Sequence, residues 1–504
     1  LFATGLSGIV AEYVLATLAS YFLGNSVIQW TLIISLMLFF MGLGSRLTRR
    51  MSGNLFQAFI VIEFVLSLLV AFSALTTYSV AAFSDYIGLY IYTLAVLTGL
   101  LIGMEIPLAI RLNEQFEELK VNVSGILEKD YYGSLLGGLF FAFIGLPYLG
   151  LTYTPFILGL INLSVAIALL NFFPIQQRFK GKAKLNLTAL TLAIAIFAGL
   201  WNAQQIIFYG EQKRYSDKIV HSEQSKYQKI VMTEWQGDHW LYLDNNLQFS
   251  SFDEVMYHEV LVHPAVQLGE QVQRALVLGG GDGCAVRELL KYAEVEQITL
   301  VDLDPAITRL AMENEILLKV NQRSLHDQRV RVVNADGFQF LENQKDFYDV
   351  IVIDLPDPRN VELSRLYSLE FYQLAWQRLR AHGVLITQAG SPYFSPKSFH
   401  CIEKTMAKAG FSTLPLHNQI ITMGEWGWIL GTKAALTREA LKERLLQIDL
   451  KAIETAWLNT EAMALISSFG KAFFMPEQTD TLRVNRIHDP VLQGYYLNGK
   501  WTLY

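Results

Sequence analysis

The first 208 residues consist mainly of long apolar stretches, and this feature most constrains how the chain can fold. A helix needs about 20 mostly apolar residues to span a bilayer. Seven segments meet that requirement, at approximately 2–23, 27–46, 55–76, 87–110, 131–150, 152–174 and 185–208. Residues 1–208 carry only 10 Lys and Arg and 9 Asp and Glu, whereas residues 209–504 carry 30 and 37. The sequence therefore predicts an α-helical transmembrane bundle over 1–208, with about seven helices, followed by a water-exposed region.

The composition of the whole chain excludes several classes of protein. The chain has 504 residues, of which 52% are hydrophobic, and a net charge of −6. Its two cysteines, Cys284 and Cys401, are too few for a disulfide framework or a metal cluster. The acidic balance disfavours a nucleic-acid partner and is compatible with a cationic ligand. We expect no bound metal.

Basic residues suggest how the bundle is oriented in a cell (inner) membrane. They gather at 46–50, 111–120 and 178–184, and the positive-inside rule places these loops in the cytoplasm. Seven full spans would then leave residues 209–504 outside. A cytoplasmic location for that region requires a re-entrant segment, a segment preceding Leu1, or an exception to the rule, and the sequence leaves these alternatives open.

Three carboxylates lie within apolar segments: Glu12, Glu63 and Glu105. Ionisable groups at membrane depth are costly unless they are paired or neutral, so each marks a candidate functional position. We expect Glu105 to pair with Arg111 near the end of its segment. For Glu12 and Glu63, hydrogen bonding within the bundle and a cation site are equally compatible with the sequence.

The water-exposed region alternates apolar runs with amphipathic segments. A small β subdomain is expected over 209–255, with Asn245 and Asn246 in a turn that needs positive φ, and a helix follows over 256–266. The apolar runs are 274–280, 297–304, 330–336, 348–354 and 383–390; the segments after them are 284–293, 305–319, 337–343, 365–380 and 397–409. This order predicts an α/β, doubly wound parallel sheet of Rossmann-like type over 256–435. We expect the C-terminal extension, 436–504, to pack against that sheet.

Ligands of such sheets bind beyond the carboxyl ends of the strands, and acidic side chains follow three successive strands here. A glycine-rich loop containing Gly279 and Gly281 allows close backbone approach, and Asp282 within it would repel a pyrophosphate, which argues against NAD. Asp302 is placed to bind a ribose diol, and Asp336 with Gly337 to reach an adenine amino group. Each acid alone is more often a helix N-cap or loop residue, but the three together indicate an adenosyl pocket.

Two further carboxylates, Asp354 and Asp357, follow the next predicted strand. They could simply end the strand and cap the next element. Beside an adenosyl pocket that already contains Asp282, they are better interpreted as a trap for an amine.

Motifs over roughly 200 residues resemble the spermidine synthase (polyamine aminopropyltransferase) family. They occur in the family's order: SKYQ at 225–228, YHE at 257–259, GGGDG at 279–283, VDLDP at 301–305, ADG at 335–337 and DLPDP at 354–358. With a multi-pass N-terminal domain, the chain is similar to the membrane-bound bacterial branch. The resemblance implies a fold of the S-adenosylmethionine-methyltransferase type.

The resemblance also implies an activity and roles for residues. Decarboxylated S-adenosylmethionine would donate an aminopropyl group to putrescine or a related polyamine, giving spermidine and methylthioadenosine, with no cofactor and with a homo-oligomer as a compatible assembly. Donor-binding residues would be Gln228, His258, Gly279, Gly281, Asp282, Asp302, Asp336 and Gly337. Acceptor-binding residues would be Gln248, Tyr257, Asp354, Asp357 and Trp426, with Asp354 as the catalytic base.

The chain departs from the family pattern mainly on the acceptor side, which leaves the acceptor open. Cys284 replaces a glycine, RNVELSRLY follows Asp357 with Glu362 as a candidate contact, and Ile421 stands where the family has a tyrosine. One alternative activity is an S-adenosylmethionine-dependent amine methyltransferase. Another is a non-catalytic polyamine sensor or transporter, for which Glu12 and Glu63 are the supporting features.

Overall fold

The computed structural model describes residues 1–24, 26–84, 86–114, 116–172, 181–475 and 480–501. The chain divides into two compact units, Leu1–Ile219 and Val220–Tyr504. Several predicted regions lie partly outside the described residues: 115 of the basic loop 111–120, 173–174 of the segment 152–174, 178–180 of the loop 178–184, and 476–479 and 502–504 of the C-terminal extension.

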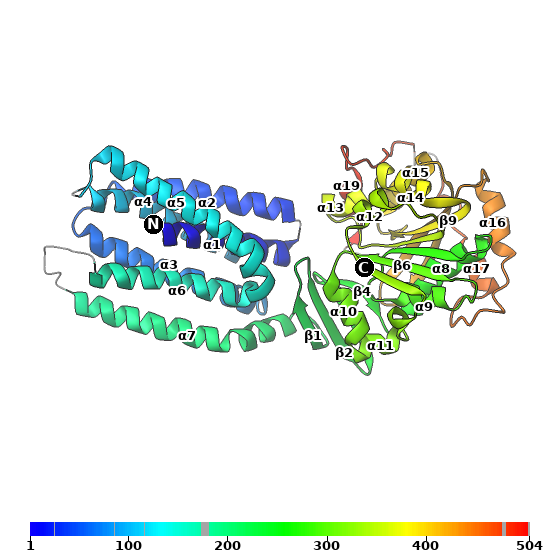
Figure 1. The fold of residues 1–504 in the computed structure, drawn as a ribbon, viewed down its shortest axis with the longest axis horizontal. Helices are drawn as coiled ribbons and strands as arrows, with labels where there is room; N and C mark the ends of the chain where they lie inside the picture. Colours follow the sequence, from blue (N-terminus) through cyan, green and yellow to red (C-terminus); the bar gives the residue numbers. More distant parts are fainter. Residues whose placement is uncertain (25, 85, 115, 173–180, 476–479, 502–504) are drawn as a thin grey trace. The chain divides into compact units, whose positions relative to one another are not determined.

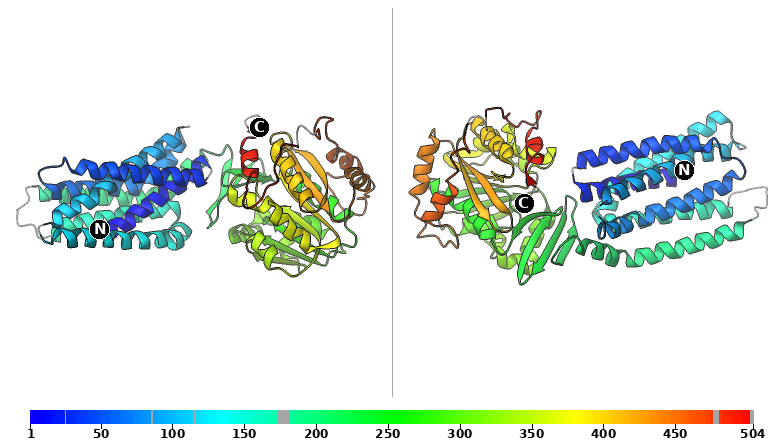
Figure 2. Two further views of the ribbon diagram at one scale, coloured as in Figure 1. Left: turned by 90° about the horizontal axis from the view of Figure 1, so that it is seen from above. Right: turned by 180° about the vertical axis from the view of Figure 1, so that it is seen from behind.

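The first unit is a bundle of long apolar helices that lie alongside one another (Figures 1 and 2). They are α1 (Phe2–Leu23), α2 (Ser26–Thr48), α3 (Leu55–Ala81), α4 (Ile87–Asn113), α5 (Leu119–Phe140), the π-helix η1 (Phe141–Leu149), α6 (Gly150–Phe172) and α7 (Lys182–Gln212). Among the described residues, six helical stretches are long and apolar enough to cross a membrane. One of them, Leu119–Phe172, covers the predicted segment 131–150 and the described part of the segment 152–174. Gly150, with φ of 61°, lies where the two segments meet.

All three carboxylates of the apolar segments are buried in this bundle. Glu12, Glu63 and Glu105 are 8%, 0% and 2% exposed. The predicted pair between Glu105 and Arg111 is wrong. Arg111 instead donates to the carbonyl oxygens of Thr48 and Met51, at 2.9 and 3.1 Å, because these carbonyls near the end of α2 lie within its reach.

A small antiparallel sheet precedes the large one, in the order β1 (Lys218–Gln224), β2 (Lys229–Trp235), β3 (Asp238–Leu243) and β4 (Asn246–Ser250). The turn between β3 and β4 has positive φ at Asp244 (48°) and Asn245 (64°), a pattern that suits a tight hairpin. The prediction was one residue late, since Asn246 already pairs with Leu243 in the ladder.

The large sheet has the strand order β10-β11-β9-β8-β5-β6-β7. Its parallel strands are β5 (Arg274–Gly279), β6 (Gln297–Asp302), β7 (Val330–Asn334), β8 (Tyr348–Asp354) and β9 (Leu379–Gly390). The edge pair β10 (Ser412–Ile420) and β11 (Gly424–Thr432) is antiparallel. The sheet is thus mixed rather than wholly parallel, because a short turn joins these last two strands.

Alternate side chains of the central strands enter two separate cores. Val277 and Val352 face one apolar cluster with α8 (Glu254–Leu268), α9 (Cys284–Leu290) and α10 (Pro305–Glu313). Leu276 and Ile351 face the other, with α12 (Gly337–Asn343), α14 (Leu369–Arg378) and α15 (Pro396–Lys408). Strands buried on both faces account for the continuous apolar runs in the sequence.

The remaining short helices are more divided than the sequence suggests. The predicted helix 305–319 is split at Asn314, whose side chain caps α11 (Glu315–Val320), and 365–380 becomes η3 (Arg365–Tyr367) and α14, preceded by α13 (Val361–Ser364). The last helices are η2 (Ser324–His326), α16 (Arg438–Leu446), α17 (Thr460–Ile466) and α19 (Leu492–Leu497).

A buried carboxylate ties the C-terminal residues to α8. Glu259 is 0% exposed, and its carboxylate accepts hydrogen bonds from the backbone N–H groups of residues 456–458, at 2.6, 3.0 and 2.7 Å. Hydrogen bonds to a charged acceptor are among the strong ones. They fix this part of the extension against the helix that carries His258.

Candidate active site

The strand order reverses between β5 and β8, and a cavity of about 480 Å³ lies at their carboxyl ends. This position is the ligand-binding crevice of open α/β sheets. All thirteen residues singled out from the sequence line the cavity: Gln228, Gln248, Tyr257, His258, Gly279, Gly281, Asp282, Asp302, Asp336, Gly337, Asp354, Asp357 and Trp426. They come from the small sheet and its β1–β2 connection, from α8, from the ends of four parallel strands and the loops after them, and from β11.

The glycine loop brings the ends of β5 and β8 into direct backbone contact. Gly279 pairs with Asp354, and a Cβ atom at Gly279, where φ is 80°, would lie 2.0 Å from the Asp354 carbonyl oxygen. At Gly281 a Cβ atom would lie 2.6 Å from Asp302 Oδ2, which instead accepts the Gly281 N–H at 3.1 Å. Only glycine fits at position 279, and a side chain at position 281 would displace the Asp302 carboxylate.

Three ionisable side chains meet at the centre of the cavity. One polar atom from each of His258, Asp282 and Asp354 lies within 4.8 Å of the others. Asp282 Oδ1 also accepts the backbone N–H of Cys284, the first residue of α9, at 2.8 Å. The two acids therefore share one chamber.

His258 is held by a buried ion pair on α8. Its Nδ1 lies 2.7 Å from Glu254 Oε2. The Glu254 carboxylate also accepts hydrogen bonds from both terminal nitrogens of Arg287, at 2.6 and 2.9 Å. Burial lowers the pKa of His258, but the hydrogen bond that its ring donates to Glu254 and the charges of Glu254, Asp282 and Asp354 outweigh burial and raise that pKa to about 9. The imidazole is thus charged at neutral pH, with Nε2 4.0 Å from Asp354 Oδ2.

Asp354 ends β8 and contacts a tyrosine from α8. Its Oδ1 accepts the Tyr257 hydroxyl at 2.8 Å, and the Tyr257 ring packs on Trp428 with centroids 5.1 Å apart. Burial raises the pKa of Asp354 above that of an ordinary aspartate, as does Asp282, while the charge of His258 and the Tyr257 hydrogen bond lower it. The result is a carboxylate that is more basic than usual but still ionised at neutral pH.

The side of the cavity assigned to the donor is ordered by hydrogen bonds among its own residues. Asp302 Oδ1 accepts the N–H of Asp304 at 2.8 Å, and burial together with Asp304 and Asp282 raises the pKa of Asp302 to about 6, although backbone hydrogen bonds oppose this. The Asp304 carboxylate accepts a hydrogen bond from Gln228 Nε2 at 3.0 Å. Asp336 is the N-cap of α12 and also pairs with Arg365, so the N-cap interpretation of this acid holds alongside its place in the cavity wall.

The side assigned to the acceptor differs most from expectation. Asp357 is 7% exposed and contacts Arg359, with the guanidinium 3.5 Å from Oδ2. Trp426 lines the cavity, whereas Ile421 is 62% exposed and is not among its lining residues. Gln248 comes from β4, and Glu362 also lines this end.

Sequence reasoning missed several lining or supporting residues. Asp304 was visible in VDLDP but received no role, although an acid followed by proline is a common start of a helix. Arg359 lies in the run that departs from the family, and nothing in its neighbourhood indicates a partner. Tyr496 donates to Asp357 Oδ2 at 2.8 Å, and a contact between residues 139 positions apart leaves no local signal.

The charges of the cavity indicate the kind of ligand it can hold. Eight carboxylates line it: Asp244, Asp282, Asp302, Asp304, Asp336, Asp354, Asp357 and Glu362. Arg359 and the charged His258 offset only part of this charge. A partly enclosed, anionic chamber favours cations, and a basic carboxylate at its centre can accept a proton from one.

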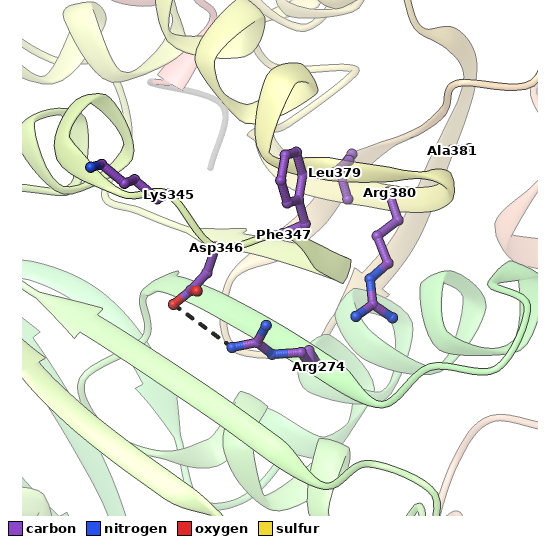
Figure 3. Close-up of a pocket in the computed structure, with 7 residues that line it drawn as sticks. All are labelled: Arg274, Lys345, Asp346, Phe347, Leu379, Arg380 and Ala381. Atoms are coloured by element: carbon purple, nitrogen blue, oxygen red, sulfur yellow. Dashed lines mark ion pairs between the residues drawn. The ribbon is translucent and has the colours of Figure 1, made fainter.

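A second depression lies at the opposite end of the strands, where β5, β8 and β9 begin. It has a volume of about 420 Å³ and is lined by Arg274, Lys345, Asp346, Phe347, Leu379, Arg380 and Ala381 (Figure 3). Arg274 and Asp346 form an exposed pair at 3.7 Å across it. It contains none of the residues singled out from the sequence, and ligands of this fold class bind at the other end of the sheet.

A family model and two similar proteins agree with the motifs. A family model described as "Spermine/spermidine synthase domain" matches residues 254–441. The chain is 42% identical to polyamine aminopropyltransferase 2 of Aquifex aeolicus, over 98% of this chain and 97% of the relative, and 39% identical to polyamine aminopropyltransferase of Oceanobacillus iheyensis, over 97% and 94%. A crystal structure of spermidine synthase with the transition state analogue AdoDATO is 26% identical, covers 53% of this chain and 89% of its own, and has a TM-score of 0.47.

The raised pKa of His258 predicts that stability falls at alkaline pH. A group whose pKa is near 6.5 unfolded and about 9 folded stabilises the fold fully below pH 6.5, and that contribution, about 3 kcal/mol, is lost as pH rises through 9. We expect the midpoint of thermal unfolding to drop between pH 6.5 and 9.5, and to drop less in His258→Gln.

The control is His382→Gln, since the His382 side chain is 71% exposed. It should show the same pH dependence as the unaltered chain. Identical pH dependence in His258→Gln would contradict the assignment of a charged, buried imidazole.

Proposed function

The chain belongs to the polyamine aminopropyltransferase family, and from that membership we propose that it transfers the aminopropyl group of decarboxylated S-adenosylmethionine to a diamine such as putrescine. The products are spermidine and methylthioadenosine. The observation that carries the proposal is the meeting of Asp282, His258 and Asp354 within 4.8 Å in one acidic cavity at the switch point of the sheet. Both substrates are cations, and this chamber is built to hold cations.

The proposed donor site comprises the glycine loop and the acids that follow three strands. Its residues are Gln228, His258, Gly279, Gly281, Asp282, Asp302, Asp336 and Gly337. Asp302 would bind the ribose diol, and Asp336 with Gly337 the adenine edge. Asp282 would hold the terminal amine of the aminopropyl group. Intact S-adenosylmethionine carries a carboxylate beside that amine, so the acidic wall would disfavour it by repulsion.

The proposed acceptor site comprises Gln248, Tyr257, Asp354, Asp357 and Trp426. An alkyl amine with a pKa near 10 is neutral only about one time in a thousand at pH 7, and its protonated form has no lone pair for attack. Asp354 would bind the ammonium and accept its proton. The amine lone pair then attacks the methylene carbon next to sulfur, and the C–S bond breaks with its electrons moving to sulfur.

The pKa of Asp354 suits this role because it is set by opposing effects. Burial and Asp282 raise the pKa, which makes the carboxylate a better base, while His258 and the Tyr257 hydroxyl keep it ionised at neutral pH. A base is most effective when its pKa approaches the working pH. His258 and Tyr257 would therefore act by tuning Asp354.

The sulfonium is a good leaving group, so the proposed reaction needs no cofactor. Most of the acceleration would come from holding nitrogen, carbon and sulfur in line within a chamber that limits water. An amine methyltransferase would use a similar donor pocket, and a sensor would bind without turnover. Product identity separates these, because only aminopropyl transfer yields methylthioadenosine and a longer polyamine.

We also propose that the apolar helices of residues 1–208 anchor the enzyme in the cell membrane and that the catalytic part lies in the cytoplasm. The catalytic part comprises the β subdomain at 209–255, the Rossmann-like domain at 256–435 and the extension at 436–504. The apolar helices support insertion, and the site of synthesis of both substrates supports the cytoplasmic side. Association with further copies of the chain stays a prediction.

Replacing the proposed base should abolish turnover but spare donor binding. For Asp354→Asn in the purified full chain we expect kcat to fall by about a thousandfold, within the usual contribution of general base catalysis. Products are identified by mass spectrometry with decarboxylated S-adenosylmethionine and putrescine, and donor affinity by calorimetry. Asp346→Asn, in the depression of Figure 3, is the matched control and should keep full activity. Unchanged turnover in Asp354→Asn would refute the mechanism.

Removing the Tyr257 hydroxyl should shift the pH profile. That hydrogen bond lowers the pKa of Asp354, so its loss in Tyr257→Phe raises the pKa. The rate requires ionised Asp354, and kcat/KM therefore falls on the acid side as Asp354 is protonated. We expect this acid limb to move to higher pH in Tyr257→Phe. A limb that stays in place, or moves to lower pH, would argue against Asp354 as the titrating base.

Reporter fusions test the proposed orientation. A fluorescent protein fused after Tyr504 should fluoresce in cells, and alkaline phosphatase fused at the same point should be inactive, because the first requires the cytoplasm and the second the exterior. The opposite pair of results would place the catalytic part outside and support the count of seven full spans with the positive-inside rule.

A further inference from the structure

The C-terminal residues 480–501 pack against the segment that follows β8. The side chain of Asn485, 0% exposed, donates to the carbonyl oxygens of Ser364 and Tyr367 at 2.8 and 3.1 Å. Gln493 Nε2 donates to the Arg359 carbonyl at 3.2 Å. These bonds fix the segment against the loop that carries Asp357, so the extension forms part of the wall behind the acceptor side.

Tyr496 on α19 reaches the cavity wall from this segment. The side chain is 5% exposed, and its hydroxyl donates to Asp357 Oδ2 at 2.8 Å. Trp501 supports it from behind, with ring centroids 4.7 Å apart and the indole N–H 2.8 Å from the Tyr496 carbonyl oxygen. A buried tyrosine held on both sides places its hydroxyl in one position.

The two oxygens of Asp357 are occupied unequally. Oδ2 accepts Tyr496 and also faces Arg359 at 3.5 Å. Oδ1 has a contact with Gln388 Nε2 at 3.5 Å, at the outer limit of a hydrogen bond. A carboxylate can accept about four hydrogen bonds, so Oδ1 retains capacity for a ligand.

Arg359 contacts both residues, because its guanidinium lies 5.8 Å from the centroid of the Tyr496 ring and 3.5 Å from Asp357 Oδ2. Guanidinium and carboxylate groups tend to form close bidentate pairs, but this pair is separated by 3.5 Å, and the hydroxyl is nearer to Oδ2. Without the hydroxyl, Arg359 is free to approach and neutralise Asp357. The negative charge of Asp357 would then no longer be available to bind the second ammonium group of a diamine.

We propose that Tyr496 is a positioning residue that keeps Asp357 available for the distal ammonium of a diamine, and so sets the preference for diamines over monoamines. The inference rests on the proposed function, since it concerns the acceptor of the same site. It assigns to the C-terminal extension a part in substrate choice.

The test compares 1,4-diaminobutane with n-butylamine, which lacks the distal ammonium, as acceptors for the full-length enzyme. In Tyr496→Phe we expect the ratio of kcat/KM for diamine to monoamine to fall about tenfold, since a hydrogen bond to a charged group is lost. The change should appear in KM for the diamine, with kcat at saturation and KM for the donor within about twofold. Tyr495→Phe is the matched control, because the Tyr495 hydroxyl on the same helix accepts only the Arg483 N–H, at 3.3 Å, among described contacts.

A double variant separates positioning from loss of packing. Asp357→Asn should lower the same ratio, and adding Tyr496→Phe to it should lower the ratio no further, since the two residues act through one carboxylate. Equal losses for both amines, additive effects, or an unchanged ratio in Tyr496→Phe would overturn the proposal.

Two measurements distinguish a failure of this proposal about Tyr496 from a failure of the proposed aminopropyltransferase function. If the unaltered chain transfers no aminopropyl group, that function fails, and calorimetric binding of the two amines still tests Tyr496. If Tyr496→Phe does not fold, Arg359→Gln supplies the complementary result: without the competing cation, Asp357 should keep or increase its preference for the diamine. A loss of that preference in Arg359→Gln would overturn the proposal.

Discussion

The contact between the ends of β5 and β8 is the constraint on which the site depends. Gly279 lies so close to the Asp354 carbonyl that no side chain fits there, and this brings the glycine loop and the end of β8 to one point. Asp282 and Asp354, which are 72 positions apart in the sequence, consequently face the same chamber. Parallel strands in register are what make such convergence possible, because their carboxyl ends meet at one edge.

Convergence of like charges is costly, and the surroundings show how the fold accommodates it. The charged His258 stands between the acids, held by Glu254, which is itself neutralised by Arg287. Glu254 and Arg287 are both buried, and two hydrogen bonds join them. A buried ion pair needs such hydrogen bonds if it is not to destabilise the fold. The central acid thereby keeps its charge while its basicity rises, a combination that neither burial nor an ion pair alone would give.

The sequence predicted the cavity far better than its inner contacts. The thirteen predicted residues line one cavity, and most of them sit in motifs at the end of a strand or near the start of a helix, positions that follow from local pattern. Gln248 and Trp426 lie within strands instead. The break of the helix at Asn314, the antiparallel edge pair and the contacts of Arg111 depend on turns and neighbours that local pattern does not determine. The same is true of Arg365 with Asp336, and of Tyr496 with Asp357, where the two partners come from distant segments and each has an ordinary local setting.

Glu259 has a consequence for how this protein can be divided. It follows His258 directly on α8, and its buried carboxylate accepts three hydrogen bonds from the backbone of residues 456–458. A chain shortened at residue 441 would take these three donors from a buried charge, one residue from the imidazole of the cavity. A minimal catalytic fragment cut from this protein would thus destabilise α8, the helix that carries His258. The C-terminal extension is therefore a structural part of the catalytic domain.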